Sequence, residues 1–217
     1  MLEGFWRQYY AISTGRQTMD INDLKRVNNL WKKIYCYMAL QIMEGYQRDS
    51  GKVLELGPFS GGISLELARL HPKLNITIAD ESAAVVKYLR QEISTSGLSG
   101  KIGVKKTKLN HLAFDDFQFD LVVFRGAFFF LNEKKNLLQE VFRVLKDGGM
   151  AFIGGGFGKG TPRELIDEIA DESRQLNDRL GRRRVSIKEL EEMVKKSELT
   201  DKCKIEEEGG VWLNIKK

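Results

Sequence analysis

The chain has 217 residues, of which 42% are hydrophobic and 30% are charged, and its formal net charge at pH 7 is +5. This length and composition predict one folded domain with a substantial core and exclude a disordered chain. No apolar run is long enough to cross a membrane, and the first residues lack the apolar core of a secretion signal. Two cysteines and two histidines disfavour both a disulfide framework and a metal cage, so we expect a cytoplasmic protein without a bound metal.

Apolar residues recur at helical spacing from Asp23 to Met43, which predicts one long amphipathic helix. Beyond a break at residues 49–52, short apolar segments alternate with amphipathic ones. The expected strands are 52–56, 75–80, 101–106, 119–124 and 150–153, and the expected helices are 63–70, 82–93 and 136–146. Because such alternation requires right-handed crossovers, it predicts a parallel sheet with helices on both faces.

Residues 159–217 extend the same plan. Thr161–Glu164 and Ser186–Glu189 have the pattern of capping boxes, each of which would begin a helix. Segments 202–206 and 211–215, joined through two glycines, predict an antiparallel hairpin at a sheet edge. We therefore predict an α/β fold with a doubly wound, mostly parallel seven-stranded sheet and a C-terminal antiparallel hairpin.

The most informative segment joins the first expected strand to the helix that follows it. The strand carries Glu55 near its end, and residues 57–62, a turn with three glycines, open the helix. Glycine lets a backbone approach a ligand closely, and a helix N-terminus offers free N–H groups. Asp80, at the end of the second strand, lies at the separation at which an acid can reach ribose hydroxyls. These features predict a nucleoside site at the switch point of the sheet.

Two common nucleotide motifs do not fit this segment. Its glycines miss the G-x-G-x-x-G spacing of dinucleotide sites, and the turn lacks the lysine and hydroxyl residue of a phosphate-binding loop. Glu55 at the strand end would repel a pyrophosphate but would attract a positively charged ligand. The sequence therefore favours a nucleoside that carries positive charge and no phosphate.

These acids and glycines resemble the motifs of the class I S-adenosylmethionine-dependent methyltransferases, whose fold is Rossmann-like. Four segments carry the resemblance, which covers roughly residues 50–157: Glu55–Gly61, Ile78–Ser82, Phe119–Val123 and Arg143–Gly149. Arg125–Phe130 and Ile153–Gly158 are also similar to a prokaryotic subset of members without a known substrate. The resemblance implies S-adenosylmethionine as cofactor and direct transfer of its methyl group from the sulfonium to a nucleophilic atom.

The resemblance also implies a role for each matching residue. Glu55 would lie beside the methionine end of the cofactor and order the turn, while Gly57 and Gly61 would allow close backbone approach. Asp80 would accept hydrogen bonds from the ribose hydroxyls, and Glu81 would flank the adenine.

Two positions depart from the family pattern. The acid that usually meets the adenine amine is absent, so Asn110 or His111 would replace it as a cofactor contact. Phe59 stands where the family has its middle glycine, beside the cofactor. Because its bulk disfavours a positive φ, the turn would be shaped differently or the pocket would be narrower.

Four further residues have two interpretations each. Arg125 would either recognise a carboxylate, of the substrate or of the cofactor, or form a surface ion pair. Phe128 would either pack in the core or line an apolar substrate pocket. Tyr9 and Tyr10 show no helical period. Because an N-terminal segment often closes over the cofactor in this architecture, both tyrosines are candidate substrate contacts, with ordinary packing as the alternative.

We interpret residues 1–217 as a single methyltransferase domain with a helical or lid segment (1–49), a cofactor-binding core (50–158) and C-terminal helices with the hairpin (159–217). No catalytic base is evident, but alignment and desolvation can supply most of the acceleration. We favour a small-molecule acceptor. RNA or protein methylation is an alternative because of the Arg182–Arg184 cluster, and a non-catalytic scaffold is another because of Phe59 and the missing acid. The oligomeric state is not indicated.

Overall fold

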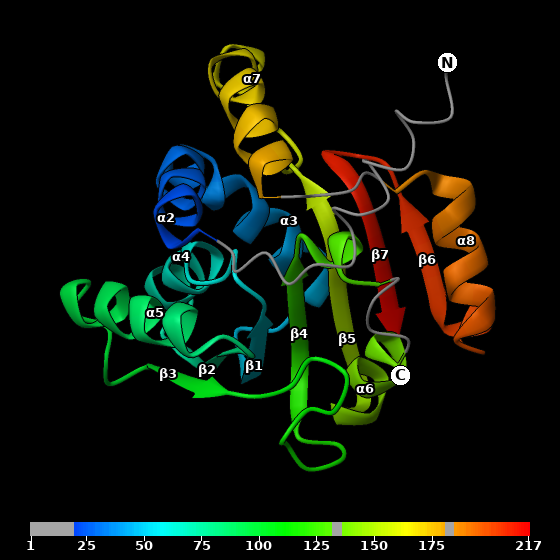
Figure 1. Ribbon diagram of the computed structural model, residues 1–217. Helices are drawn as coiled ribbons and strands as arrows, with labels where there is room; N and C mark the ends of the chain where they lie inside the picture. Colours follow the sequence, from blue (N-terminus) through cyan, green and yellow to red (C-terminus); the bar gives the residue numbers. More distant parts are fainter. Residues whose placement is uncertain (1–19, 132–135, 181–184) are drawn as a thin grey trace, which may run out of the picture.

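The computed structural model describes residues 20–131, 136–180 and 185–217 (Figure 1). Tyr9, Tyr10 and the Arg182–Arg184 cluster lie outside these ranges. Within them, the strands form one sheet of seven in the order β3-β2-β1-β4-β5-β7-β6. The strands are β1 (Ser50–Leu56), β2 (Lys73–Asp80), β3 (Ile102–Lys106), β4 (Phe119–Arg125), β5 (Leu145–Gly156), β6 (Cys203–Glu206) and β7 (Gly210–Lys216).

Strand directions and register confirm the predicted fold class. Strands β1 to β5 are parallel, and β7 runs antiparallel to both β5 and β6. The hairpin therefore enters the sheet with β7 inside and β6 at the edge. The chain runs outward from β1 through β2 to β3 and then crosses back to β4 on the other side of β1, and this reversal creates the switch point at the carboxyl end of β1.

Both faces of the central strands are buried, as their nearly continuous apolar sequences predict. In β4, Leu121 and Val123 belong to one core cluster, whereas Val122 and Phe124 belong to the other. The first cluster is covered by α2 (Ile21–Leu30), η1 (Trp31–Lys33), α3 (Tyr35–Tyr46), α4 (Gly62–Leu70) and α5 (Ala83–Thr95). The second is covered by α6 (Leu137–Val144) and α8 (Ile187–Lys196).

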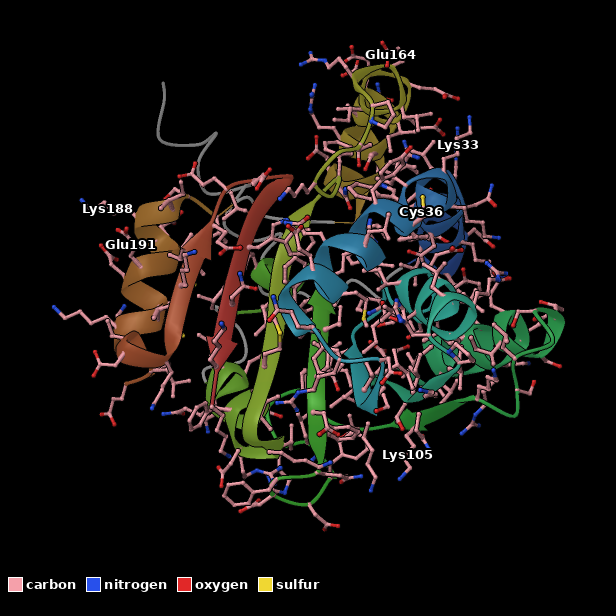
Figure 2. The ribbon with its side chains drawn as sticks, turned by 180° about the vertical axis from the view of Figure 1, so that it is seen from behind. Lys33, Cys36, Lys105, Glu164, Lys188 and Glu191 are labelled. Atoms are coloured by element: carbon pink, nitrogen blue, oxygen red, sulfur yellow. The ribbon has the colours of Figure 1, made fainter. Side chains whose placement is uncertain are left out.

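Helix α7 (Arg163–Arg179) stands above the carboxyl ends of the strands and packs against α2 (Figure 1). Figure 2 views the sheet from the side of α2 and α3, with Lys33 on η1, Cys36 on α3 and Lys188 on α8 at the far edge. Two short 3-10 turns, η2 (Ala127–Phe129) and η3 (Thr200–Lys202), complete the described elements. Every helix in the described ranges is too short or too polar to cross a membrane.

The expected helix from Asp23 to Met43 is wrong as a single element. The chain leaves helical geometry at Ile34, whose φ is −120° and ψ is −3°, and this break separates α3 from α2 and η1. The apolar period continues across the break, which explains why periodicity alone does not reveal it. The break brings Trp31 and Tyr35 to the same side of the switch point, where both contact Arg125.

Both ends of strand β5 differ from expectation. The helix expected over 136–146 ends at Val144, and Lys146 belongs instead to β5, where its Nζ donates to Asp120 at 2.7 Å. Strand β5 also continues through Gly154–Gly156, beyond its expected end at residue 153. The run of glycines stays in the strand because β7 pairs with it as far as Gly210.

One of the two expected capping boxes is present. Ser186 Oγ accepts from the backbone of Glu189 at 3.3 Å, and the Glu189 carboxylate accepts from Ser186 N at 2.9 Å. The box expected at Thr161 is wrong. Its hydroxyl donates to the carbonyl of Phe157 at 2.6 Å, and α7 begins after Pro162 without a side-chain cap.

Candidate active site

Glu55 organises the turn between β1 and α4. Its side chain is buried, and Oε2 accepts from Gly61 N at 2.9 Å, Ser64 N at 3.1 Å and Ser64 Oγ at 2.5 Å. Oε1 is also buried and has no hydrogen-bond partner among the described residues. Burial raises the pKa of Glu55, although the hydrogen bonds from Ser64 and Gly61 oppose this effect. One oxygen therefore holds the turn, and the other is left for a further donor.

The glycine positions of the turn are required by backbone geometry. Gly57 has a φ of +90°, and a Cβ built there would come within 2.5 Å of Phe124 Cε2. Gly61, which caps α4, has a φ of +104°. Phe59 does not adopt a positive φ, so its bulk places no strain on the turn. Its side chain is instead buried beneath Arg125, with 5.2 Å between the ring centroid and the guanidinium carbon.

Arg125, the last residue of β4, is buried with 5% of its surface exposed. Its guanidinium carbon lies 4.0 Å from the ring centroid of Trp31 and 5.4 Å from that of Tyr35. Nη1 donates to Tyr35 OH at 3.4 Å and to the Phe59 carbonyl at 3.5 Å, both of which are long contacts. Burial lowers the pKa of Arg125, while Tyr35 and Glu55 favour its charged form. The surface ion-pair interpretation is therefore wrong.

The carboxyl end of β2 lies beside the turn between β1 and α4. Gly57 N donates to the Ala79 carbonyl at 3.0 Å, which places the first glycine beside the start of the β2–α5 connection. Asp80 is buried, and its Oδ1 accepts from Ser82 N at 2.7 Å; Glu81 is half-buried. The structure thus brings the two acids that end β1 and β2 to adjacent positions at the switch point.

Asn110 and His111 lie on the connection from β3 to β4, and both are exposed. This connection is tied to α6 at the residue that follows them, because Leu112 N donates to Glu140 Oε2 at 2.7 Å. Ala113 N also donates to Thr107 Oγ1 at 2.8 Å. The connection therefore has a defined path past the end of β3.

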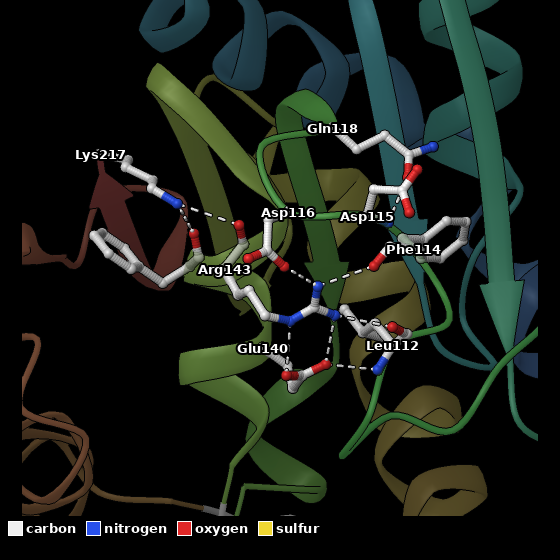
Figure 3. Close-up of polar contacts among 9 residues, drawn as sticks. Leu112, Phe114, Asp115, Asp116, Gln118, Glu140, Arg143 and Lys217 are labelled. Atoms are coloured by element: carbon white, nitrogen blue, oxygen red, sulfur yellow. Dashed lines mark hydrogen bonds and ion pairs between the residues drawn. The ribbon is translucent and has the colours of Figure 1, made fainter.

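A cluster around Arg143 anchors this connection (Figure 3). The guanidinium donates to the carbonyls of Leu112 and Phe114, each at 2.9 Å, and to Asp116 Oδ1 at 2.6 Å. It also forms a two-point contact with Glu140, with both distances 2.9 Å. Hydrogen bonds from Arg143 hold the pKa of Glu140 below its ordinary value, although burial opposes this. The sequence offers one signal for the pair, the i,i+3 spacing of an acid and an arginine.

A cavity of about 480 Å³ lies beside Arg125, between the carboxyl ends of β4 and β5 and helix α7. Its described lining residues are Trp31, Phe59, Arg125, Gly126, Phe128, Gly154, Gly155, Gly156, Phe157, Ala170, Ser173, Arg174, Asn177, Asp178, Val185 and Val211. Phe128 is therefore part of the cavity wall. The contribution of α7 was not foreseen from the sequence, because Ser173 and Asn177 belong to no motif.

Comparison with known proteins finds one matching family model and several distant relatives. Residues 53–149 match the family described as "Methyltransferase domain". Among curated proteins, the chain is 28% identical over 105 residues to a ubiquinone/menaquinone biosynthesis C-methyltransferase UbiE of Geotalea daltonii, an alignment covering 48% of this chain and 45% of that one. The enzyme of the same name in Erwinia tasmaniensis is 27% identical over 136 residues, covering 61% and 52%. The chain thus spans about half the length of the curated relatives it matches.

Solved structures share the whole fold. A Methanococcus maripaludis protein assigned to the S-adenosyl-L-methionine-dependent methyltransferases has a TM-score of 0.77 at 24% identity, covering 94% of this chain and 95% of that one. A SAM-dependent methyltransferase from Aquifex aeolicus has a TM-score of 0.61 at 17% identity, covering 88% and 96%. Residues 53–149 therefore match a methyltransferase domain, and the chain has the Rossmann-like fold of the solved S-adenosylmethionine-dependent methyltransferases.

Proposed function

We propose that the chain transfers a methyl group from S-adenosylmethionine to a nucleophilic atom of a small molecule. The observation that supports this most is the carboxylate of Glu55, which is buried at the strand tip with Oε1 unpartnered among the described residues. A buried carboxylate oxygen without a donor is costly, so the site suits a ligand that brings a positive charge or a hydrogen-bond donor. The methionine end of the cofactor, with its ammonium and sulfonium groups, has this chemistry.

The residues around Glu55 suit the rest of the cofactor. The backbone of Gly57 and Gly61 would lie along it, and the Asp80 carboxylate would accept from the ribose hydroxyls. Glu81, with Asn110 or His111, would meet the adenine. When bound, S-adenosylmethionine supplies an electrophilic methyl group: the lone pair of the acceptor forms the new bond, the carbon–sulfur bond breaks with its electrons left on sulfur, and any proton on the acceptor passes to solvent.

The chain's own contribution would be alignment and exclusion of water. The Trp31 and Phe59 rings and the Arg125 side chain form one buried layer at the carboxyl end of β4, next to the cavity. Rigid walls of this kind hold two reactants in a productive orientation, which can lower a barrier by about 7–11 kcal/mol. No described residue needs to act as a base if the acceptor atom is already nucleophilic.

A small molecule is the acceptor that the cavity favours. Its volume of about 480 Å³ lies within the usual range of small-molecule sites, about 300–1,000 Å³. The names of the curated relatives place them in quinone biosynthesis, which also supports an acceptor of this size. The Arg182–Arg184 cluster, on which the RNA and protein alternatives depend, lies outside the described residues.

Calorimetric titration with S-adenosylmethionine and its demethylated product tests the proposal directly. The wild-type chain should bind both, and Glu55→Gln should bind more weakly by about tenfold or more, because a charge-assisted contact is lost. Glu66→Gln is the matched control, since Glu66 lies on α4 and pairs with Arg69 at 2.7 Å. A thermal melt of Glu55→Gln separates loss of binding from loss of the folded turn. If the wild-type chain binds neither compound, the proposed function is wrong.

A further inference from the structure

We propose that the cavity beside Arg125 holds the methyl acceptor, and that this acceptor is a flat, largely apolar molecule whose carboxylate pairs with Arg125. The inference rests on the proposed methyl transfer, because it names the substrate class of the same site. Three features of the described residues support it: a buried guanidinium with no carboxylate hydrogen-bonded to it, an aromatic lining and a polar far side.

The charge of Arg125 is not neutralised at contact distance by any described residue. Arg125 is buried, with 5% of its surface exposed, and its only hydrogen bonds within the described residues are the two long contacts from Nη1. Glu55 attracts it electrostatically, but no hydrogen bond or ion pair joins the two side chains, and Glu55 Oε2 accepts instead from the glycine turn. A buried guanidinium is costly unless it is paired, and its planar fork matches a carboxylate with two parallel hydrogen bonds.

The cavity wall next to the guanidinium is aromatic. The rings of Trp31 and Phe157 stack with centroids 5.1 Å apart and an interplanar angle of 4°. Phe59 and Phe128 line other parts of the same cavity, while the Gly154–Gly156 stretch of β5 lines it without side chains. Flat aromatic rings pack best against such walls. The aromatic, apolar lining therefore favours an aromatic, and hence planar, body attached to the anionic group.

Polar groups on α7 line the far side. Ser173 Oγ accepts from Trp31 Nε1 at 2.8 Å and from Asn177 Nδ2 at 3.3 Å, which leaves the hydroxyl hydrogen to donate. Asn177 Oδ1 is buried without a partner among the described residues. Arg174 and Asp178 also line the cavity, but both are exposed, so solvent and salt screen their charges. The buried charge of Arg125 therefore decides which end of a ligand is anionic.

The cofactor's own carboxylate is the rival partner for Arg125. Binding measurements can distinguish a carboxylate of the acceptor from that of the cofactor. The probes are 2-naphthoate and its uncharged counterpart 2-naphthamide, titrated by calorimetry into the full chain with the demethylated cofactor present. We expect the carboxylate to bind at least about tenfold more tightly than the amide. Arg125→Gln should remove that difference and leave affinity for the demethylated cofactor within about threefold of wild type. Arg163→Gln, an exposed arginine on α7 that pairs with Asp167, is the matched control.

Equal binding of the two probes to the wild-type chain would overturn the proposal. So would a loss of affinity for the demethylated cofactor in Arg125→Gln that is as large as the loss for 2-naphthoate, because Arg125 would then bind the cofactor. If Arg125→Gln does not fold, Gly155→Val tests whether the probe binds in this cavity. A Cβ at Gly155 meets no described atom within 4 Å, so a folded variant is expected. Gly155→Val should weaken the binding of 2-naphthoate at least about tenfold and leave cofactor binding unchanged. Unchanged binding of 2-naphthoate would show that the probe binds elsewhere and would overturn the proposal.

Failure of the proposed function would look different. If the wild-type chain does not bind the demethylated cofactor, methyl transfer is wrong. The two probes, titrated without cofactor, would still show whether the cavity selects a carboxylate through Arg125.

Discussion

The ring of Tyr35 lies directly against Gly62, so that a Cβ built on Gly62 would come within 2.1 Å of Tyr35 Cε2. This contact joins the first turn of α3 to the first turn of α4. The Tyr35 hydroxyl accepts from Arg125, and burial raises the pKa of Tyr35, which keeps the hydroxyl neutral. The packing of two helices therefore sets the position of a group that covers the buried guanidinium.

Gly62→Ala tests this packing. The added methyl group cannot fit without moving the Tyr35 ring, so we expect the free energy of unfolding to fall by about 1–3 kcal/mol, as for other overpacked sites. Urea unfolding followed by circular dichroism measures it. Gly100→Ala is the control, because a Cβ at Gly100 meets no described atom within 4 Å. An equal change in the two variants would contradict the role of the Tyr35 contact.

Asp80→Asn should weaken binding of the demethylated cofactor while the fold is kept. The amide oxygen of asparagine can still accept from Ser82 N, but charge-assisted bonds to ribose hydroxyls, worth about 1.5–3 kcal/mol, would be lost. Calorimetry should show a drop of about tenfold or more. Asp49→Asn, at an exposed pair with Lys73, should leave the affinity unchanged. Wild-type affinity in Asp80→Asn would exclude the proposed ribose contact.

Glu140→Gln should destabilise the chain in a pH-dependent way. Hydrogen bonds from Arg143 lower the folded-state pKa of Glu140 below its unfolded value of about 4.3. The contribution of its charge is therefore present above about pH 4.3 and is lost as the pH falls through the folded-state pKa. We expect Glu140→Gln to cost about 1.5 kcal/mol at pH 7, with the difference from wild type shrinking below about pH 4.

Urea unfolding at several pH values tests this expectation. Asp167→Asn, which removes an exposed partner of Arg163, should show little effect at any pH. If the loss of unfolding free energy in Glu140→Gln stays constant down to pH 3, the shape of the side chain and not its charge explains the destabilisation.

Trp31→Phe should weaken the docking of α7 more than the loss of a surface ion pair does. The indole Nε1 donates to buried Ser173 at 2.8 Å, and its removal should cost about 1 kcal/mol in the free energy of unfolding. Arg26→Gln breaks an exposed pair with Glu172, and exposed pairs contribute about 0–1 kcal/mol. Chemical unfolding of both variants makes the comparison. A larger loss of unfolding free energy in Arg26→Gln than in Trp31→Phe would contradict the expectation that the Trp31–Ser173 hydrogen bond contributes more to the docking of α7.

The sheet was predictable because local and global signals agree in it. Strands such as β4 are apolar on both faces, which only a covered parallel sheet satisfies, and its expected range of 119–124 is within one residue of Phe119–Arg125. The break at Ile34 was not predictable, because apolar spacing continues through it and tertiary contacts of Trp31 and Tyr35 stabilise it. The start of β5 at Leu145 was missed for a similar reason, since its pairing with Phe119 lies far away in sequence.

Some residues of the candidate site were likewise predictable from the sequence, and others were not. Glu55, Gly57 and Asp80 follow directly from strand ends, so a linear motif is enough to find them. The burial of Arg125 depends on Trp31, which is distant in sequence, and the far wall of the cavity comes from α7. Nothing in the local sequence of α7 distinguishes Ser173 or Asn177 from other polar helix residues.

The three consecutive glycines of β5 have unequal freedom to change. A Cβ on Gly154 would lie 2.3 Å from the Val211 carbonyl oxygen, and one on Gly156 would lie 2.2 Å from that of Gly209, so the backbone of the hairpin forbids both. Only at Gly155 does an added Cβ meet no described atom within 4 Å. Of the three positions, residue 155 alone can therefore gain a side chain without disturbing strand pairing, so sequence variation along this wall of the cavity should concentrate there.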